Sequence, residues 1–438
     1  MNLSRQQIII ISSVVFVILF FVGIFTGVLP GSRMFTQKPP DVTLTVWGID
    51  DKDFLQSGII DYEALRTNVM VKYEEINPVG YEQKVLNALA AGIGPDVIMF
   101  SNSWLLKHFD KIVPVAETQL NKKSLQELFP TVIEQDFAPN DKIFALPLYI
   151  DTLGLYYNVD TFDKKGIALP PEDWLDFQNL IPKLMEKNSD GSISKAAAAI
   201  GGTNNTVDKG ADLLMLLMLQ SGAKMTNDDF SVASFAQGID QSTPGIDALS
   251  FYAKFSNPED IYYTWNESLD YSLDSFANGD TVMIFNYASA KDIIKSKNPF
   301  LNFKVAGMPQ PYISGKDKAI NYPNYWGLAV TKNSQNADWA WDFVLYMTAN
   351  EVTAEKYLTA SVRPPALRVL IKKYAEHPTL GVFAKQALSA RSWMQLDANQ
   401  DTMIFSEMVK SVLNGQLTIN EALFQAEREV TEVMQSGK

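Results

Sequence analysis

The sequence predicts an α/β body of two tightly joined lobes, preceded by one N-terminal transmembrane helix. Strand-like and helix-like patterns alternate from residue 42 to residue 100, and a second α/β-like stretch follows without a flexible linker. An uncharged apolar run occupies residues 8–29. The composition, with 47% hydrophobic and 20% charged residues among 438, is that of a globular chain that can bury a large core.

Charge and residue usage exclude several functional classes. Fifty acidic against 37 basic residues give a net charge of −13, and no Lys/Arg cluster forms a basic face, so we expect no nucleic-acid partner. The acidic surface suits a neutral or cationic solute. Cysteine is absent, which excludes disulfides, thiol catalysis and a lipid-modified cysteine anchor. Because only His108 and His377 occur, we expect no metal, no cofactor and no serine–histidine triad.

The apolar run is long enough to span a bilayer. Twenty-two residues, 8 to 29, form about 33 Å of helix against a hydrocarbon core of about 30 Å. The end of the run includes Phe25-Thr26-Gly27 and lacks the Ala-x-Ala-like pattern of small residues that marks a signal-peptide cleavage site. This favours an uncleaved signal anchor at 1–29, with cleavage as the alternative, and a short tether at 30–40. The few flanking charges leave the orientation open.

The first part of the body predicts a largely parallel sheet. Strands are expected at 42–47, 68–76 and 95–100, separated by helices at 57–67 and 81–91. Ligands of such sheets lie beyond the carboxyl ends of the strands. Two of those ends, around Asp50 and at 101–104, carry polar and aromatic residues.

The middle and the end of the chain are richer in helix. Helices are expected at 171–187, 211–221, 273–278, 337–348, 403–413 and 419–434, and strands at 281–285 and 325–331. The 211–221 helix is almost wholly apolar but too short to span a membrane, which predicts a buried core helix. Residues 186–197 imitate the start of a calcium loop, but Ala197 replaces the required glutamate, so we expect a turn.

Several segments recur in a characteristic order between residues 42 and 375. They are Gly94–Ile98, Ile143–Asn158, Pro170–Pro171 with Trp174, Phe276–Ile284, Asn298–Pro299, Tyr325–Val330 and Arg363–Pro365. Together they resemble the bacterial extracellular solute-binding proteins of ABC importers, in the sugar-binding, maltose-binding-protein-like branch. The resemblance implies a two-lobed periplasmic-binding-protein-like fold with a hinge and a central cleft. Lobe one would comprise 41–150 and 308–362, and lobe two 151–307 and 363–438.

The resemblance also implies a function. The chain would be a membrane-anchored extracytoplasmic solute receptor, not an enzyme, that binds a carbohydrate between its lobes and delivers it to an ABC permease. Because the chain has no P-loop motif, a separate ATPase subunit would be needed. We expect a monomer, held by a single pass in the cytoplasmic membrane with its body on the extracytoplasmic side.

The family pattern further implies a set of ligand-binding residues. They are Asp50, Ser101, Asn102, Tyr149, Asp151, Tyr287, Trp326 and Arg363, with Trp47, Trp104 and Trp265 as further candidates. Carboxylates and amides would bind sugar hydroxyls, and aromatic rings would cover the apolar C–H faces. Alternatives stay open for three of them: Asp51 competes with Asp50, Trp47 suits the core equally well, and Arg363 suits a loop salt bridge.

Two other functions fit the same residues. Asp50 and Asp151 would serve a glycosidase if they met across the cleft at about 5–10 Å. Alternatively, a membrane-held sensor would bind the same solute but signal to a partner receptor. Loss of aryl-glycoside hydrolysis on replacing either aspartate would identify the enzyme, and the neighbouring genes would identify the sensor.

Overall fold

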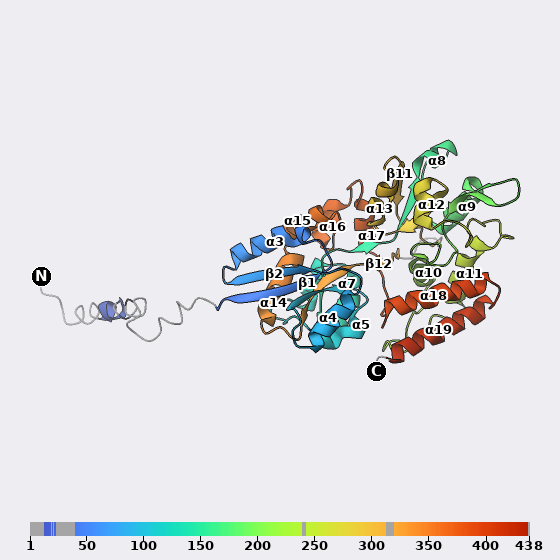
Figure 1. The fold of residues 1–438 in the computed structure, drawn as a ribbon. Coiled ribbons are helices and arrows are strands. Elements are labelled where there is room, and N and C mark those ends of the chain that lie inside the picture. The colour runs from blue at the N-terminus through green and yellow to red at the C-terminus, as the bar shows by residue number, and fades with distance from the viewer. Residues whose placement is uncertain are drawn as a thin grey trace, which may run out of the picture.

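Two lobes lie side by side in the computed structural model, which describes residues 13–18, 20, 22, 40–238, 242–311 and 319–436 (Figure 1). The predicted transmembrane helix at 8–29 and the tether at 30–40 fall largely outside these residues. Within the described ranges, no helix has the length and apolarity needed to cross a bilayer.

The first lobe is built on a sheet with strand order β2-β1-β3-β13-β4, in which β5 also pairs with β13. β1 runs parallel to β2 and β3, and β13 runs antiparallel to β3, β4 and β5. The strands are β1 (Val42–Gly48), β2 (Val69–Glu75), β3 (Val97–Ser101), β4 (Ile112–Val113), β5 (Leu146–Pro147) and β13 (Trp326–Thr331). The predicted parallel strands are therefore confirmed, and a strand from far along the chain completes the sheet.

Helices pack against this sheet to close the first core. They are α3 (Lys52–Leu65), α4 (Tyr81–Ala90), α5 (Leu105–His108), α6 (Lys122–Leu128), α7 (Thr131–Phe137), α14 (Ala337–Ala349), α15 (Glu351–Ser361) and α16 (Arg368–Tyr374), with short 3-10 turns at Phe109–Lys111 and Pro139–Asp141. Leu370 and Ile371 of α16 belong to this core, beyond the expected boundary at residue 362.

The second lobe holds a sheet with strand order β11-β7-β10-β9-β8. Its strands are β7 (Gly154–Asn158), β8 (Glu186–Lys187), β9 (Ile193–Ala198), β10 (Thr281–Asn286) and β11 (Phe303–Ala306). Its helices are α8 (Val159–Lys164), α9 (Trp174–Leu184), α10 (Gly210–Gln220), α11 (Pro244–Ala253), α12 (Ser272–Asn278), α13 (Ala290–Lys297), α18 (Ala398–Leu413) and α19 (Ile419–Ser436), with a 3-10 turn at Lys254–Ser256. Helix α10 is buried, as its composition predicts. Met308 and Tyr322 belong to this core, past the expected boundary at residue 307.

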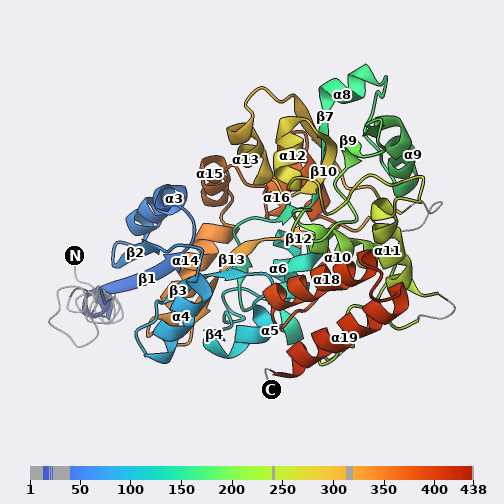
Figure 2. The same cartoon turned by 45° about the vertical axis from the view of Figure 1, so that its right-hand side comes forward.

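The chain crosses between the lobes along a short two-stranded ladder. β6 (Asp151–Thr152) pairs antiparallel with β12 (Pro323–Asn324), so that Asn324 lies opposite Asp151. Helix α17 (Gly381–Ala387) packs against β6 of this ladder (Figure 1). The chain then enters the second lobe through α18 and α19 (Figure 2). Three segments of the chain thus connect the lobes, and they form the floor on which a cleft is built.

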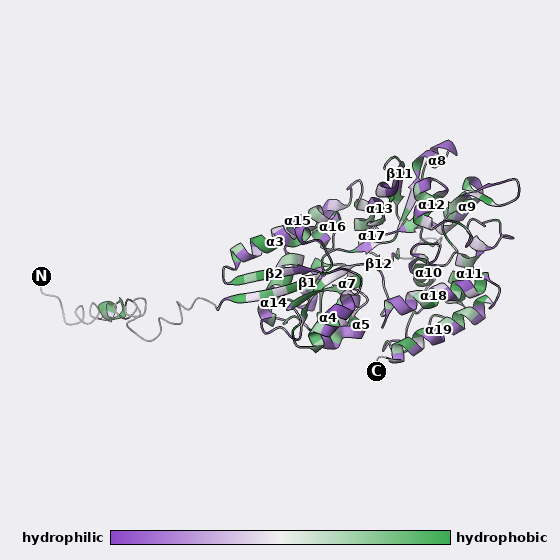
Figure 3. Ribbon diagram, viewed as in Figure 1, coloured by the Kyte–Doolittle hydropathy of each residue, from purple (hydrophilic) through white to green (hydrophobic). Residues whose placement is uncertain are grey.

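Local capping explains where the observed helices differ from the predicted ones. Helix α3 begins five residues before the predicted start because the Asp51 side chain accepts the Asp53 amide. Helix α18 begins at Ala398 for the same reason, since the Asp397 carboxylate accepts amides of its first turn. Helix α19 carries both hydrophobic and hydrophilic residues, as an amphipathic helix on one side of a core requires (Figure 3). The 186–197 region is a β8–β9 hairpin, which confirms the predicted turn.

Candidate functional site

Two adjoining cavities separate the lobes. The first cavity, of about 840 Å³, lies between β3, α4 and α5 of the first lobe and α10 and α18 of the second. The second cavity, of about 640 Å³, lies between Ile49, Tyr149 and Arg363 on one side and β11 and α13 on the other. Lys209, Asn324 and Trp326 line both cavities. The two cavities therefore adjoin beside the interlobe ladder, and together they are called the cleft below.

Three aromatic rings from the first lobe form a wall of the first cavity. The Trp104 and Trp326 ring centroids lie 5.0 Å apart at an interplanar angle of 73°. Tyr81 stacks on Trp104 at 5.9 Å, and its hydroxyl donates to the carbonyls of Trp47 and Met99. Because these bonds hold Tyr81 in place, the two half-buried tryptophans have a fixed support. The wall gives the cleft a rigid apolar face.

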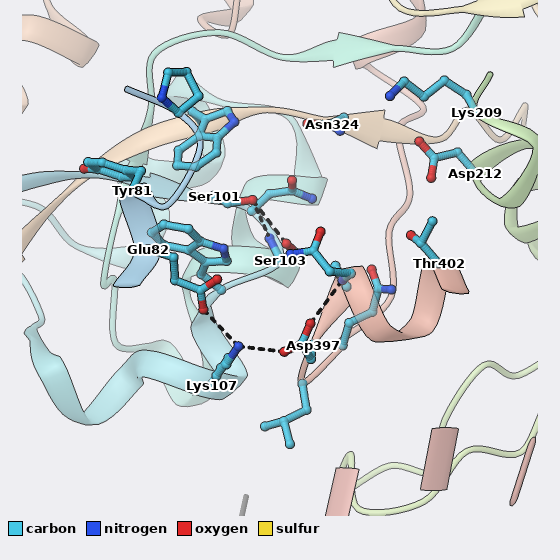
Figure 4. Close-up of a pocket in the computed structure, with 18 of the residues that line it drawn as sticks. Tyr81, Glu82, Ser101, Ser103, Lys107, Lys209, Asp212, Asn324, Asp397 and Thr402 are labelled. Atoms are coloured by element: carbon cyan, nitrogen blue, oxygen red, sulfur yellow. Dashed lines mark hydrogen bonds and ion pairs between the residues drawn. The ribbon is translucent and has the colours of Figure 1, made fainter. Parts of the chain in front are cut away.

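Polar side chains of the second lobe face this wall. Figure 4 shows Ser101 and Ser103 on one side of the first cavity and Lys209 and Asp212 on the other. Asp212 accepts a hydrogen bond from the Tyr287 hydroxyl at 2.8 Å, and burial raises the pKa of its carboxyl. A ligand between the lobes would therefore meet aromatic rings on one face and hydrogen-bonding groups on the other.

Asp151 is central to the second cavity. Its carboxylate accepts the amides of Thr152 at 2.8 Å and of Ala288 at 3.0 Å, which ties the ladder to the second lobe. Burial raises the pKa of Asp151 to about 7, although these amides and nearby Arg363 act to lower it. Near neutral pH this side chain can therefore both donate and accept a hydrogen bond.

Arg363 is positioned by a buried carboxylate. Its guanidinium lies 2.8 Å from the Asp50 Oδ1 and 4.3 Å from the centre of the Tyr149 ring. Tyr357 donates to the Asp50 Oδ2 at 2.7 Å and accepts from Arg363 at 2.9 Å. Asp50 itself is only 2% exposed and lines neither cavity. Asp50 orients Arg363 toward the cleft. Arg363 therefore forms the loop salt bridge and also lies at the edge of the cleft.

The structure brings most of the predicted residues to the cleft. Ser101, Asn102 and Trp104 line the first cavity, Tyr149, Asp151, Tyr287 and Arg363 line the second, and Trp326 lines both. Asn102 also has a structural role, because it accepts from the Tyr325 amide and donates to Asp136.

Three predicted residues line neither cavity. Asp50 is enclosed by Arg363 and Tyr357 and lines neither cavity, whereas Asp151 lines the second. Trp265 is fully buried in the second lobe, where its indole N–H donates to Thr206. Trp47 lies on β1 with the Lys84 ammonium 5.0 Å from its ring, outside both cavities.

Several residues that line the cleft are not among those predicted from the sequence. The largest group precedes or opens α10, namely Asn204, Asp208, Lys209 and Asp212. One signal pointed to it: Asp212 is the only charged residue in an otherwise apolar helix, and a charge in a buried helix needs a polar environment. Asn324, Asp397 and Thr402 gave no comparable signal.

An ion-pair network joins the lobes at the edge of the first cavity. Lys107 on α5 lies 2.9 Å from Glu82 on α4 and 2.7 Å from Asp397 at the start of α18 (Figure 4). A hydrogen bond with His108, together with Lys107, lowers the pKa of Glu82 to about 2. The network therefore remains charged throughout the physiological pH range, and its Lys107–Asp397 pair crosses the cleft.

We predict that Lys107→Gln shifts the unliganded protein toward more open lobes. The half-buried pair is worth about 1 kcal/mol, enough to change an open-to-closed ratio about fivefold. Small-angle X-ray scattering should show a larger radius of gyration for the variant. Lys84→Gln is the matched control, because Lys84 pairs with Glu74 within the first lobe. Identical scattering by the Lys107 variant, Lys84 variant and wild type would contradict the prediction.

A second prediction concerns Asp401, which is hydrogen-bonded to Gln395 of the first cavity's lining. It is fully buried, its Oδ2 accepts from Gln395, and its Oδ1 has no hydrogen-bond partner among the described residues. Burial raises its pKa to about 7, above the unfolded value of about 4. This carboxyl thus contributes stability below pH 4 that is lost as the pH rises through 7.

Asp401→Asn should therefore flatten the pH dependence of stability. Between pH 5.5 and pH 8 we expect the wild type to lose about 2 kcal/mol that the variant keeps. Urea unfolding at the two pH values measures this difference. An equal loss in both proteins would show that Asp401 is not the titrating group.

The geometry can be compared with known proteins. The family model described as bacterial extracellular solute-binding protein matches residues 48–354, more than half of the chain. A binding protein of Brucella abortus is 24% identical over 114 residues, which are 26% of this chain and 28% of that protein. The multiple sugar-binding protein of Streptococcus mutans is 23% identical over 237 residues, 53% of each chain. The matches thus span between about a quarter and a half of these relatives.

Solved structures share the fold over nearly the whole chain. The cyclic α-maltosyl-1,6-maltose binding protein of Arthrobacter globiformis is similar with a TM-score of 0.75 and 17% identity, covering 91% of this chain and 100% of that one. A solute-binding protein of Thermotoga lettingae bound to α-D-tagatose gives a TM-score of 0.67 and 21% identity, covering 90% and 99%. At these identities the likeness concerns the two-lobed fold. Together with the family match, it shows that this chain belongs to the bacterial extracellular solute-binding proteins.

Proposed function

We propose that this chain is a membrane-anchored extracytoplasmic receptor that binds a carbohydrate between its lobes and delivers it to an ABC import permease. The observation that carries the proposal is the wall of Tyr81, Trp104 and Trp326 facing the polar groups of Lys209 and Asp212. Sugars present apolar C–H faces and polar hydroxyl edges, and this cleft offers a surface for each.

Similar proteins support a carbohydrate as the solute. The streptococcal relative is a multiple sugar-binding protein, and one solved structure of this fold is a cyclo/maltodextrin-binding protein complexed with maltotetraose. The first cavity, at about 840 Å³, has room for more than one sugar ring. The glycosidase alternative is less favoured, because Asp50 is paired with Arg363 and lines neither cavity.

Binding would couple to movement of the lobes about the interlobe ladder. A solute that contacts both lobes stabilises the closed arrangement by its differential affinity for that state. We propose that lobe one comprises 41–150, the segment from about 325 and the helices through α16, and that lobe two comprises 151 to about 322 with α18 and α19. This division follows the two hydrophobic cores. The closed monomer would then dock on the permease.

The anchor rests on the sequence of residues 8–29, whose length suits a bilayer. Alkaline carbonate extraction of membranes tests it, because an integral protein stays in the pellet. A variant that lacks residues 1–29 but carries a cleavable leader should move to the soluble fraction. Release of the full-length chain by carbonate would contradict the anchor while leaving sugar binding untouched.

A thermal-shift screen tests the binding function. The full-length chain in detergent is exposed to mono-, di- and oligosaccharides and, separately, to amino acids, polyamines and phosphates. A ligand at 100 times its Kd should add about 2.7 kcal/mol of stability, which is easily seen. A shift with a carbohydrate supports the proposal. Shifts only with amino acids or polyamines would overturn the sugar assignment.

A further inference from the structure

The two cavities differ in charge. The first is lined by four acidic side chains and two basic ones, whereas the second is lined by five basic side chains and two acidic ones. The basic set of the second cavity is Lys209, Lys291, Lys295, Lys304 and Arg363, and its acidic set is Asp151 and Asp292. In a chain of 50 acidic and 37 basic residues, this local excess of positive charge runs against the composition.

Part of this positive charge is already matched within the protein. Arg363 is paired with Asp50, and the Lys295 ammonium donates to the Leu301 carbonyl and lies over the Phe303 ring. Among the described residues, Lys209 forms a single ion pair, a long one of 3.7 Å to Asp208.

The remaining lysines carry charge that the described part of the chain does not neutralise. Lys291 on α13 and Lys304 on β11 line the second cavity without an ion-pair partner among the described residues. They come from neighbouring elements of one lobe, opposite Arg363 of the other. A cleft with one sign of charge and low-dielectric walls concentrates its field and attracts ions of opposite sign.

The acidic groups of this cavity weaken that field only in part. The Asp151 carboxylate is engaged by the backbone amides of Thr152 and Ala288, and its raised pKa of about 7 leaves it partly protonated at neutral pH. Asp292 is exposed on α13 beside Lys291. An anionic substituent on a bound solute would therefore meet more positive than negative charge here.

We propose that the natural solute is an acidic carbohydrate, whose carboxylate or sulfate group occupies the second cavity while its uncharged part lies against Trp104 and Trp326 in the first. This inference rests on the proposed carbohydrate-binding function and assigns its substrate class. It differs from the expectation drawn from net charge, because the charge of a surface does not determine the charge of a cavity.

Matched pairs of sugars test the proposal on the full-length chain in detergent. Calorimetry at 50 mM salt would compare trigalacturonate, trimannuronate and a sulfated chondroitin disaccharide with galactotriose, mannotriose and maltotriose. We expect at least one acidic sugar to bind about tenfold or more tightly than its neutral counterpart, with an affinity that falls as salt is raised to 500 mM. The carboxylate and sulfate arms distinguish which anion the cavity accepts.

A double variant localises the effect. Lys291→Gln with Lys304→Gln should weaken binding of the acidic sugar about tenfold, since each ion pair contributes a few-fold, and should change neutral-sugar affinity less than twofold. Lys297→Gln is the control, because Lys297 lies on the same helix, pairs with Asp274 and lines neither cavity. An equal loss of acidic-sugar affinity in the Lys297 variant would show that the overall charge of the protein causes the effect. That result would overturn the assignment to this cavity.

The remaining outcomes separate this inference from the function on which it rests. If neutral sugars bind as tightly as acidic ones, the acidic substrate class is overturned and the carbohydrate receptor stands. If no saccharide of either kind binds, the proposed function itself fails.

Discussion

Replacing Arg363 by methionine is expected to lower the free energy of unfolding by about 3–5 kcal/mol, because it leaves the buried Asp50 carboxylate without its cation. The Asp50 side chain is 1% exposed, and the guanidinium lies 2.8 Å from it. Among the described residues, only Tyr357 would then hydrogen-bond this buried carboxylate. Urea unfolding monitored by circular dichroism measures the loss. The variant should also bind sugar more weakly, since Arg363 stacks on Tyr149 at the cleft.

Two further variants decide whether the charge is the cause. The double variant Asp50→Asn with Arg363→Met removes both charges, and it should recover a substantial part of the loss. Arg391→Met is the matched control, because Arg391 is exposed and its side chain forms no ion pair among the described residues. A loss below about 1 kcal/mol in the Arg363 single variant, equal to that of the control, would contradict the account.

Replacing Trp326 by alanine is expected to weaken carbohydrate binding by about 1–3 kcal/mol, a 5- to 150-fold rise in Kd. Trp326 lines both cavities and packs against Trp104 at 5.0 Å, so its loss removes the ring at the centre of the cleft and disturbs the wall. Calorimetry with the sugar identified in the thermal-shift screen gives the difference directly. Trp326→Phe, which keeps a ring, should retain part of the affinity.

Trp339→Ala serves as the control for this change. Trp339 is also a half-buried tryptophan of the first lobe, but it lies on α14 and lines neither cavity. Both variants should lose packing energy, and only the Trp326 variant should lose affinity. Unchanged affinity in Trp326→Ala would remove this ring from the binding site.

The sequence was sufficient to predict those cleft residues whose position follows from the ends of strands and from family-like segments. Ser101 ends β3, Asn102 follows it directly, and Trp326 opens the antiparallel neighbour β13, so strand pairing alone brings them together. The same reasoning placed Asp50 at the end of β1. There the fold differs, because Arg363 and Tyr357 arrive from more than 300 residues away and enclose the carboxylate.

The sequence alone does not predict which residues the packing of the two lobes brings together. The Lys107–Asp397 pair joins residues 290 positions apart, and it depends on how α18 is placed against α5. The sequence does not distinguish Trp265 from Trp326, but Trp265 is fully buried in the second lobe, where it donates to Thr206, while Trp326 borders the cleft. Periodicity describes which face of an element is apolar and leaves open which lobe covers it.

A crystal structure of the full-length chain with the carbohydrate that gives the largest thermal shift tests the central claim most directly. We predict that the sugar lies in the interlobe cleft, with a ring against Trp326 and hydrogen bonds to side chains of both lobes, Lys209 or Asp212 among them. A sugar bound outside the two cavities, or one held by a single lobe, would contradict a receptor that encloses its solute between the lobes.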